Sequence, residues 1–391
     1  MSKFRINFIA FISASLVVFF IGYLFESYII KNFFYYIKQI DIKDNTSSLL
    51  KNTFKLQEDL ESGKLVLFGS SELTNHSHKY IPENFFNKTL KQPLISNGHA
   101  GHQSFAIMTQ LAALSNKKVK ENARVIVFLS PGWFEKPYAK GTNIASFLEY
   151  VDSIMLYKLY FESDVSEHYK KLVSSYIRKH FFSIKNPSFS YVYSAIYPYN
   201  SIFFLQKKFI RKNLEKLKNH KIKKIIYNIP SLNWENLKKD ALKNAEPSTN
   251  NEYGINNDYY TKYVLPNIKK GKFPHKIEVP SIKNNQEYKD FLNLTRLLKD
   301  YKIKPLFIMQ DQNPYAYTNR ESMLPILSKI KKELKKYGYG YLDMWTYRKE
   351  DYKIGKLTDV MHTGELGWIE IDKKIIEHFF KNKERGVGNV K

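Results

Sequence analysis

Five short apolar segments, spread along nearly the whole chain, constrain its fold more than any other feature. These predicted strands, rich in Val, Ile, Leu and Phe, are Lys64–Phe68, Pro93–Ser96, Arg124–Leu129, Lys304–Met309 and Gly340–Met344. Near-continuous apolar strands are typical of sheets covered on both faces. Segments with helical patterning alternate with them, at Gln103–Ser115, Glu287–Lys299, Arg320–Lys336 and Trp368–Lys381. This alternation predicts a doubly wound parallel sheet in a three-layer α/β/α fold.

The alternation is interrupted between residues 137 and about 282. This stretch is long, rich in Tyr, Phe and Lys, and mostly helical in pattern. We expect it to form a large insertion, or a cap over the carboxyl edge of the sheet, where folds of this kind keep their functional sites. A chain of 391 residues is long enough for one large core with such an insertion, or for two domains.

A membrane anchor is predicted at the N-terminus. Residues 6–25 carry no charged side chain and match the length that a helix needs to span a bilayer. Two basic residues precede the segment, as at a cytoplasmic end, although further lysines follow it. Bulky residues stand where a signal-peptide cleavage site needs small ones. We therefore expect an uncleaved anchor over residues 1–25, a helical stalk over residues 26–62 and an extracytoplasmic domain over residues 63–391.

Composition narrows the possible chemistry and the possible partners. Cysteine is absent, which excludes disulfides, thiolate metal sites and a cysteine nucleophile. The 62 Lys and Arg residues outnumber the 37 Asp and Glu residues, giving a formal net charge of +25. Such an excess favours a polyanionic neighbour, which could be nucleic acid, an anionic membrane surface or a phosphate polymer. A Lys- and Asn-rich, AT-biased genome accounts for the same excess, and both explanations stay open.

Two short motifs far apart in the chain make chemical sense together. Gly69-Ser70-Ser71 directly follows the first predicted strand, and Asp359-Val360-Met361-His362 precedes the last predicted helix. A strand ending in glycine and a small hydroxyl residue presents a nucleophile at the edge of a parallel sheet. An Asp three residues before a His in a loop can hold one imidazole nitrogen while the other faces the hydroxyl, as in a Ser–His–Asp triad. The alternative is a serine that only caps a helix and a histidine that lies in a surface loop.

Three further segments carry a family resemblance. They are Ser130-Pro131-Gly132-Trp133-Phe134, Gly364 together with Gly367-Trp368, and Thr249-Asn250-Asn251-Glu252-Tyr253-Gly254-Ile255. With the two motifs above, their order resembles the SGNH (GDSL-like) hydrolase superfamily. More specifically, it resembles the DltD family, the membrane-anchored proteins of D-alanyl-lipoteichoic acid biosynthesis. The resemblance covers nearly the whole chain, including the predicted anchor.

The resemblance assigns roles to individual residues. Ser71 takes the place of the superfamily nucleophile, and Ser70 stands where the superfamily has an Asp. His362 is the implied general base, and Asp359 orients it. The implied oxyanion hole consists of the backbone N–H groups of Ser71 and Gly101. The superfamily draws a third donor from an Asn of its third motif, which this chain replaces with Ser-Pro-Gly-Trp.

Other polar and aromatic side chains near these motifs are candidate binding groups. Glu72 and Trp133 are expected substrate contacts, with the Glu72 carboxylate facing the ammonium group of a D-alanyl unit. The alternative for Glu72 is a favourable charge at a helix N-terminus. Four histidines follow the first two strands and could bind zinc, namely His76, His78, His99 and His102. No carboxylate or cysteine completes a familiar zinc pattern, so we expect no metal and no cofactor.

The resemblance implies a serine acyltransferase of the SGNH type. It would transfer D-alanine to the polyglycerolphosphate of lipoteichoic acid from a single-pass position on the outer face of the cell membrane. A membrane-bound O-acyltransferase and the D-alanyl carrier system are the implied partners, and nucleic acid is not one. Two alternatives stay open: a wall-polysaccharide O-acetyltransferase or esterase on the same fold, and a non-catalytic scaffold for a membrane O-acyltransferase.

Overall fold

The structure is a computed structural model that describes residues 10–17, 20, 48–185, 187, 189–197, 222–245 and 250–380. The predicted anchor lies largely outside these residues, and of its apolar segment residues 10–17 form a helix with exposed side chains. The predicted stalk is described only from Ser48 onward. Within the described part of the chain, no helix combines the length and the apolar character that crossing a membrane requires.

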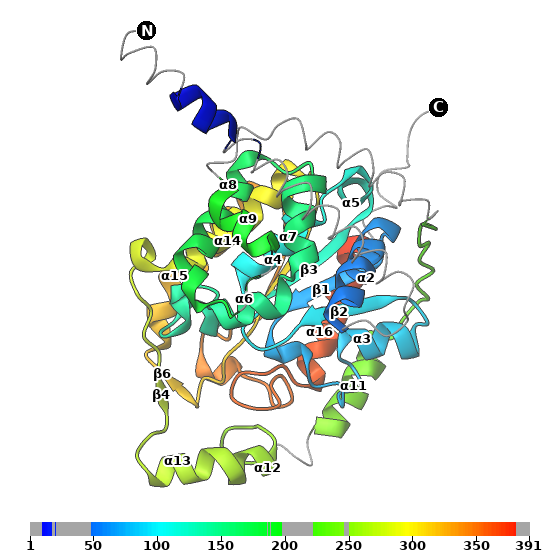
Figure 1. Ribbon diagram of the computed structural model, residues 1–391. Helices are drawn as coiled ribbons and strands as arrows, with labels where there is room; N and C mark the ends of the chain where they lie inside the picture. Colours follow the sequence, from blue (N-terminus) through cyan, green and yellow to red (C-terminus); the bar gives the residue numbers. More distant parts are fainter. Residues whose placement is uncertain are drawn as a thin grey trace.

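A five-stranded parallel sheet forms the centre of the molecule (Figure 1). Its strand order is β2-β1-β3-β5-β7. The strands are β1 (Leu65–Gly69), β2 (Leu94–Gly98), β3 (Arg124–Leu129), β5 (Leu306–Met309) and β7 (Gly340–Asp343). Every neighbouring pair in this sheet is parallel. The predicted α/β fold with a parallel sheet is therefore confirmed, and all five predicted strands belong to it.

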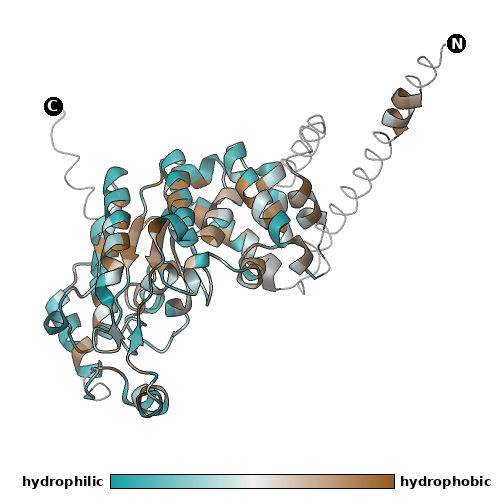
Figure 2. Cartoon of the chain, turned by 90° about the vertical axis from the view of Figure 1, so that its left-hand side faces the viewer, coloured by the Kyte–Doolittle hydropathy of each residue, from teal (hydrophilic) through white to brown (hydrophobic). Residues whose placement is uncertain are grey.

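Helices cover both faces of the sheet because successive side chains of each strand point to opposite sides. Val66 and Phe68 of β1 join a buried cluster with three helices on one face, α4 (Ser104–Ala113), α14 (Gln286–Asp300) and α15 (Leu324–Lys336). Leu65 and Leu67 join a second cluster with α16 (Glu365–Phe379) on the other face. Figure 2 shows hydrophobic strands in the interior and hydrophilic outer surfaces on the helices.

The described residues between 137 and 282 are mostly helical, and their helices lie in three places. The first four extend the layer that contains α4, and they are α6 (Ile144–Tyr150), α7 (Ser153–Tyr157), α8 (Glu167–His180) and α9 (Phe189–Ile196). Helix α11 (Trp234–Ala245) packs against α16 on the opposite face. The segment with α12 (Asn257–Tyr259) and α13 (Leu265–Lys269) lies at the foot of the molecule in Figure 1. There Asn256 donates a backbone hydrogen bond of 2.8 Å to Thr358, in the loop that carries the Asp-x-x-His motif.

The remaining elements are short or peripheral. They are α2 (Ser48–Ser62), α3 (Pro82–Asn84), α5 (Lys117–Asn122) and a two-stranded parallel pair, β4 (His275–Lys276) with β6 (Tyr317–Thr318). Three π-helical turns are η2 (Phe85–Thr89), η5 (Lys158–Glu162) and η10 (Tyr260–Val264). The 3-10 turns are η1 (Ser71–Leu73), η3 (Pro131–Phe134), η4 (Tyr138–Lys140), η6 (Phe181–Ser183), η11 (Ile282–Asn284), η12 (Arg320–Met323) and η13 (Lys349–Asp351).

The carboxyl end of β1 lies at a topological switch point of the sheet. The chain leaves β1 toward β2 on one side and returns to β3 on the other, so the strand order reverses at this point. In open α/β sheets such a reversal opens a crevice at the carboxyl edge, where ligands bind. Gly69 and Gly98 end β1 and β2 side by side, and a Cβ on Gly98 would collide with the carbonyl oxygen of Gly69. Glycine at this position therefore lets the two turns that follow these strands lie close together.

Candidate active site

Ser71 lies in the first turn after β1, at the sheet edge described above. It begins the 3-10 helix η1, and the backbone N–H of Thr74 returns to its carbonyl oxygen at 3.2 Å. Its side chain is half-buried, and Ser71 Oγ lies 3.0 Å from Nε2 of His362. The two residues are 291 positions apart in the sequence. The fold therefore brings the two predicted motifs into hydrogen-bond contact.

His362 is held from its other side by Asp359. Nδ1 of His362 lies 2.6 Å from Oδ2 of Asp359, and the second carboxylate oxygen accepts the backbone N–H groups of Met361 at 2.8 Å and of His362 at 2.7 Å. The loop that carries them is closed by a backbone bond of 2.8 Å from Thr358 to His362. The hydrogen bond to Asp359 favours the tautomer with a proton on Nδ1, which leaves Nε2 free to accept the Ser71 proton.

The pair is electrostatically coupled. Burial of the Asp359 carboxyl would raise its pKa, but the hydrogen bond and charge of His362 outweigh burial and lower the pKa. Burial, the largest single effect on His362, would lower the pKa of the imidazole, but the hydrogen bond and the charge of Asp359 act together against it, and the pKa of His362 is raised. The negative charge of Glu72 adds to this increase. A histidine with a stabilised imidazolium accepts a proton from a nucleophile more readily.

Ser70, Glu72 and Trp133 form a buried network behind the nucleophile. Both carboxylate oxygens of Glu72 accept hydrogen bonds from Ser70, one from its backbone N–H and one from its hydroxyl at 2.9 Å. The indole Nε1 of Trp133 donates to the Ser70 hydroxyl oxygen at 3.2 Å. Glu72 is 3% exposed and Trp133 is 5% exposed. Burial raises the pKa of Glu72, because it disfavours the charged carboxylate.

The expected contact of Glu72 and Trp133 with substrate stays a prediction, and their hydrogen bonds point to a second role. Their polar atoms are directed at Ser70 and not at solvent. The network instead ties the turn after β1 to the turn after β3, so it fixes the backbone that presents Ser71. Glu72 lies in the first turn of the 3-10 helix η1, as its alternative role at a helix N-terminus requires, and its carboxylate reaches back to Ser70.

Gly101, the second expected oxyanion donor, lies in the turn after β2. Its φ of +84° belongs to the left-handed region that favours glycine, and a Cβ there would collide with the side chain of Ser146. Because β1 and β2 are neighbours, this turn and the turn of Ser71 leave the same edge of the sheet. The role of the two N–H groups in an oxyanion hole stays a prediction.

The four histidines considered for zinc do not share a ligand position, and three of them have separate partners. His102 is fully buried between the carbonyl oxygen of Asn97 and the side chain of Gln110, at 3.1 and 3.0 Å, and burial lowers its pKa to about 4. His76 lies 3.9 Å from Glu83, and His78 lies 3.6 Å from Glu365. His99 is exposed. Over the described ranges, no group of three or more His, Cys, Asp or Glu side chains is arranged to hold a metal ion.

A polar cavity of about 390 Å³ adjoins Asp359. Amide, hydroxyl and carboxylate groups dominate its lining, which comprises Asn75, Ser77, His78, Asn244, Ala245, Asn256, Tyr259, Gly355, Leu357, Thr358, Asp359, Gly364 and Glu365. The lining combines hydrogen-bond donors with acceptors, which suits a ligand rich in hydroxyl groups. The segment before α12 supplies part of the wall, so a piece of the predicted insertion borders the candidate site.

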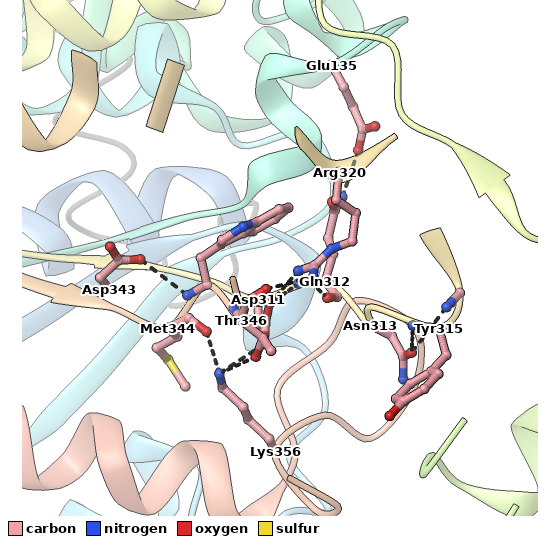
Figure 3. A network of polar contacts seen from close by, with 12 residues as sticks. Glu135, Asp311, Gln312, Asn313, Tyr315, Arg320, Asp343, Met344, Thr346 and Lys356 are labelled. Atoms are coloured by element: carbon pink, nitrogen blue, oxygen red, sulfur yellow. Dashed lines mark hydrogen bonds and ion pairs between the residues drawn. The ribbon is translucent and has the colours of Figure 1, made fainter. Parts of the chain in front are cut away.

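The sequence motifs did not indicate a buried cluster around Asp311 that lies beside the same loop (Figure 3). Asp311 follows β5, and Arg320 and Lys356 form ion pairs with it at 3.1 and 2.9 Å. These residues come from three separate segments with no local pattern in common. The one available signal was the position of Asp311 directly beyond a predicted strand, at the edge where functional residues gather.

The fold and the site define an α/β protein with a Ser–His–Asp arrangement at the carboxyl edge of a parallel sheet. Comparison with known proteins identifies the family. The family model for the DltD protein matches residues 42–380. Protein DltD of Bacillus subtilis (strain 168) is 23% identical over 369 residues, covering 88% of this chain and 90% of that protein. Protein DltD of Staphylococcus aureus (strain NCTC 8325 / PS 47) is 21% identical over 373 residues, covering 88% of this chain and 89% of that protein. The chain belongs to the DltD family, which confirms the resemblance seen in its motifs.

Proposed function

We propose that this protein takes part in the D-alanylation of lipoteichoic acid and transfers D-alanine through Ser71. Membership of the DltD family supports the general role. The observation that carries the catalytic part is the hydrogen-bonded chain from Asp359 through His362 to Ser71, with distances of 2.6 and 3.0 Å. Such a chain is the arrangement that activates a serine hydroxyl for attack on an acyl group.

In the proposed first step, Ser71 Oγ attacks the carbonyl carbon of an activated D-alanyl ester while its proton moves to Nε2 of His362. The tetrahedral oxyanion accepts hydrogen bonds from the backbone N–H groups of Ser71 and Gly101. As the intermediate collapses, the leaving oxygen takes the proton from His362, and the D-alanyl group stays on Ser71 as an ester. Asp359 stabilises the imidazolium that forms between these two proton transfers.

In the second step, a hydroxyl of the polyglycerolphosphate gives its proton to Nε2 of His362 and attacks the acyl carbon. The new ester forms, the bond to Ser71 Oγ breaks, and the proton returns to Ser71. The polar cavity next to Asp359 is a suitable place for the glycerol unit, because its lining hydrogen-bonds hydroxyl groups. A membrane-bound O-acyltransferase and the D-alanyl carrier system would supply the acyl group.

The proposed location is the outer face of the cell membrane. The uncharged residues 6–25 support a single N-terminal anchor, and family membership supports a place in the cell envelope. The proposed division is an anchor over residues 1–25, a stalk over residues 26–62 and a domain over residues 63–391, with the insertion at about 137–282. Digestion of the domain by protease added to intact protoplasts measures this topology, and full protection would refute it.

Replacement of single residues tests the catalytic proposal. Ser71→Ala and His362→Ala should each lower the D-alanyl ester content of lipoteichoic acid to background, since loss of a triad member costs about 10⁴-fold or more in rate. Ser166→Ala, which changes an exposed serine outside the site, is the matched control. In the wild type, trapping with the D-alanyl donor and intact-mass measurement should show an acyl adduct on Ser71. A Ser71→Ala strain with normal D-alanine content would favour the scaffold, and an acetyl adduct would favour the O-acetyltransferase.

A further inference from the structure

The cluster around Asp311 has no part in the proton transfers above, yet its charged side chains are largely buried and joined by hydrogen bonds and ion pairs. The Asp311 side chain is 0% exposed and accepts hydrogen bonds from the guanidinium of Arg320 at 3.1 Å and from the backbone N–H of Thr346 at 2.9 Å. Arg320 also donates to the carbonyl of Thr346 at 2.7 Å and lies over the ring of Trp345, 4.1 Å from its centroid. Asp311 and Thr346 follow β5 and β7, so these contacts join the carboxyl ends of two strands.

Lys356 reaches the cluster from a segment further along the chain than β7. Its ammonium lies 2.9 Å from Oδ2 of Asp311 and 3.0 Å from Oγ1 of Thr346, and it also donates to the carbonyl of Met344 (Figure 3). All three hydrogens of the ammonium therefore have acceptors at the ends of β5 and β7. The side chain of Lys356 is 13% exposed.

The backbone of Lys356 belongs to the loop that carries His362. The carbonyl of Lys356 accepts the N–H of Gly364 at 2.8 Å, so Lys356 stands at the closed base of the loop, three residues before Asp359. Ser71, by contrast, is carried by β1. The distance between His362 Nε2 and Ser71 Oγ therefore depends on how this loop is fixed to the sheet.

We infer that the Lys356–Asp311 ion pair positions His362 against Ser71. Both members act through the loop and are positioning residues. The part of this inference that concerns reactivity rests on the proposed function.

When the pair is broken, the base of the loop loses the contacts of its ammonium with the ends of β5 and β7. The backbone N–H of Asn313 still donates to the carbonyl of Val360 at 2.9 Å, and Gln310 still donates to the carbonyl of Met361, so the base of the loop is released and not its tip. The shift of the base moves Nε2 of His362 relative to Ser71 Oγ. A misplacement of about 1 Å lowers the rate of a reaction between two positioned groups by about 10²-fold.

A purely structural role for a buried ion pair is the competing explanation. In Lys356→Met the Asp311 carboxylate keeps Arg320 as its partner at 3.1 Å, so this substitution breaks the pair and leaves no buried charge uncompensated. Thermal unfolding and Ser71 labelling well below the unfolding temperature separate the explanations. If the pair only stabilises the fold, Lys356→Met unfolds at a lower temperature and the folded protein is labelled at the wild-type rate. If the pair positions the loop, labelling of the folded protein is slower. Lys356→Gln also removes the charge and serves as the second variant if Lys356→Met does not fold.

The experiment uses the full-length protein in detergent and a fluorophosphonate probe, which reacts with activated serines. For Lys356→Met we expect labelling of Ser71 to be slowed by about tenfold or more. Amide exchange in the peptide that covers residues 355–364 should be faster by a similar factor, with the β1 and β3 peptides unchanged. The pH midpoint of labelling should stay at the wild-type value, because Asp359 and His362 are paired within the loop. Lys353→Met, at an exposed lysine on the same segment, is the matched control and should behave as wild type.

Each outcome decides the inference. Unchanged labelling and unchanged exchange in Lys356→Met would overturn it. A lower unfolding temperature in Lys356→Met, with the folded protein labelled at the wild-type rate, would overturn it in favour of a structural role. A wild type that the probe labels no better than Ser71→Ala refutes the proposed nucleophile instead. In that case the exchange rate of residues 355–364 still decides whether the pair fixes the loop.

Discussion

At the scale of single residues, the site combines a base with a raised pKa and a partner acid with a lowered one. The pKa of His362 is raised and that of Asp359 is lowered because each stabilises the charged form of the other. The raised pKa of His362 contributes stability that is present below about pH 6.5 and is lost as the pH rises through its folded-state value. Catalysis needs the neutral imidazole. The pH range that favours activity is therefore the range in which this pair stabilises the fold less.

Asp359→Asn tests the coupling at this scale. Without the carboxylate, burial is the main remaining effect on His362, and it lowers the pKa of the imidazole. We expect the acid limb of the labelling profile, where the imidazole becomes protonated, to move from above pH 6.5 in the wild type to a lower pH. The plateau should fall by about 10³- to 10⁴-fold, because Asn does not enforce the required tautomer. The measurement is the rate of fluorophosphonate labelling between pH 5 and 9.

The control for this substitution is Glu350→Gln, which removes a charge from an exposed carboxylate that precedes the Asp-x-x-His motif in the sequence. Its profile should overlap that of the wild type. If Asp359→Asn kept the wild-type midpoint, the carboxylate would not set the pKa of His362. A shift of similar size in Glu350→Gln would trace the effect to general charge and not to the pair.

At the scale of secondary-structure elements, the tight junction between β1 and β2 controls where Ser71, the proposed nucleophile, lies. We expect Gly98→Ala to destabilise the protein by about 1–3 kcal/mol, the usual cost of overpacking, because its Cβ would meet the backbone oxygen of Gly69. Gly132→Ala is the matched control, since its Cβ would meet its nearest neighbour, Glu135, at 3.4 Å, an ordinary contact. Thermal unfolding of both variants measures the difference. Equal melting temperatures would show that the two turns can separate without cost.

The elements themselves were largely predictable, because each strand is a local apolar run and each core helix has a local apolar stripe. The differences have local causes. β5 begins at Leu306 and not at Lys304, and the intervening Pro305 has no N–H to donate to a ladder. The segment predicted as one helix from Arg320 starts as a 3-10 turn, and α15 begins only at Leu324, where Pro325 occupies its first turn.

The candidate site was predictable only where its residues belong to short sequence motifs. Ser71 follows a recognisable strand, and Asp359 and His362 are three residues apart, so short motifs reveal all three. The Asp311–Lys356 pair joins residues 45 positions apart that meet only because β5 and β7 are neighbours. The inward orientation of Glu72 depends on the 3-10 geometry of a single turn, which the sequence pattern does not specify.

At the scale of the whole molecule, the dominant property is the formal charge of +25. In the proposed reaction, the acceptor is a polymer with one negative charge on each phosphate. Long-range attraction would raise the local concentration of this polymer at the protein surface. Each transferred D-alanyl group adds an ammonium and lowers the negative charge of the product. The same electrostatics that bind the acceptor would therefore help to release the product.

The excess of positive charge predicts that polyglycerolphosphate binds this protein much less tightly as the salt concentration rises. Exposed charges are screened over about 10 Å at 0.1 M salt, so the long-range part of the attraction is lost first. We expect the affinity for polyglycerolphosphate to fall by about tenfold or more between 50 and 200 mM salt, as for other phosphate backbones. Calorimetric titration at several salt concentrations measures the slope. D-alanylated polymer should bind less tightly than bare polymer at every concentration.

The competing explanation, that the lysines reflect genome composition, predicts a different pattern. Binding would then show a weak salt slope and would be equally strong for unrelated polyanions of the same length, such as polyglutamate. Equal affinity for bare and D-alanylated polymer would remove the charge-driven release of product. It would leave the Ser71–His362–Asp359 mechanism intact, because that mechanism depends on contacts within the site and not on the net charge of the surface.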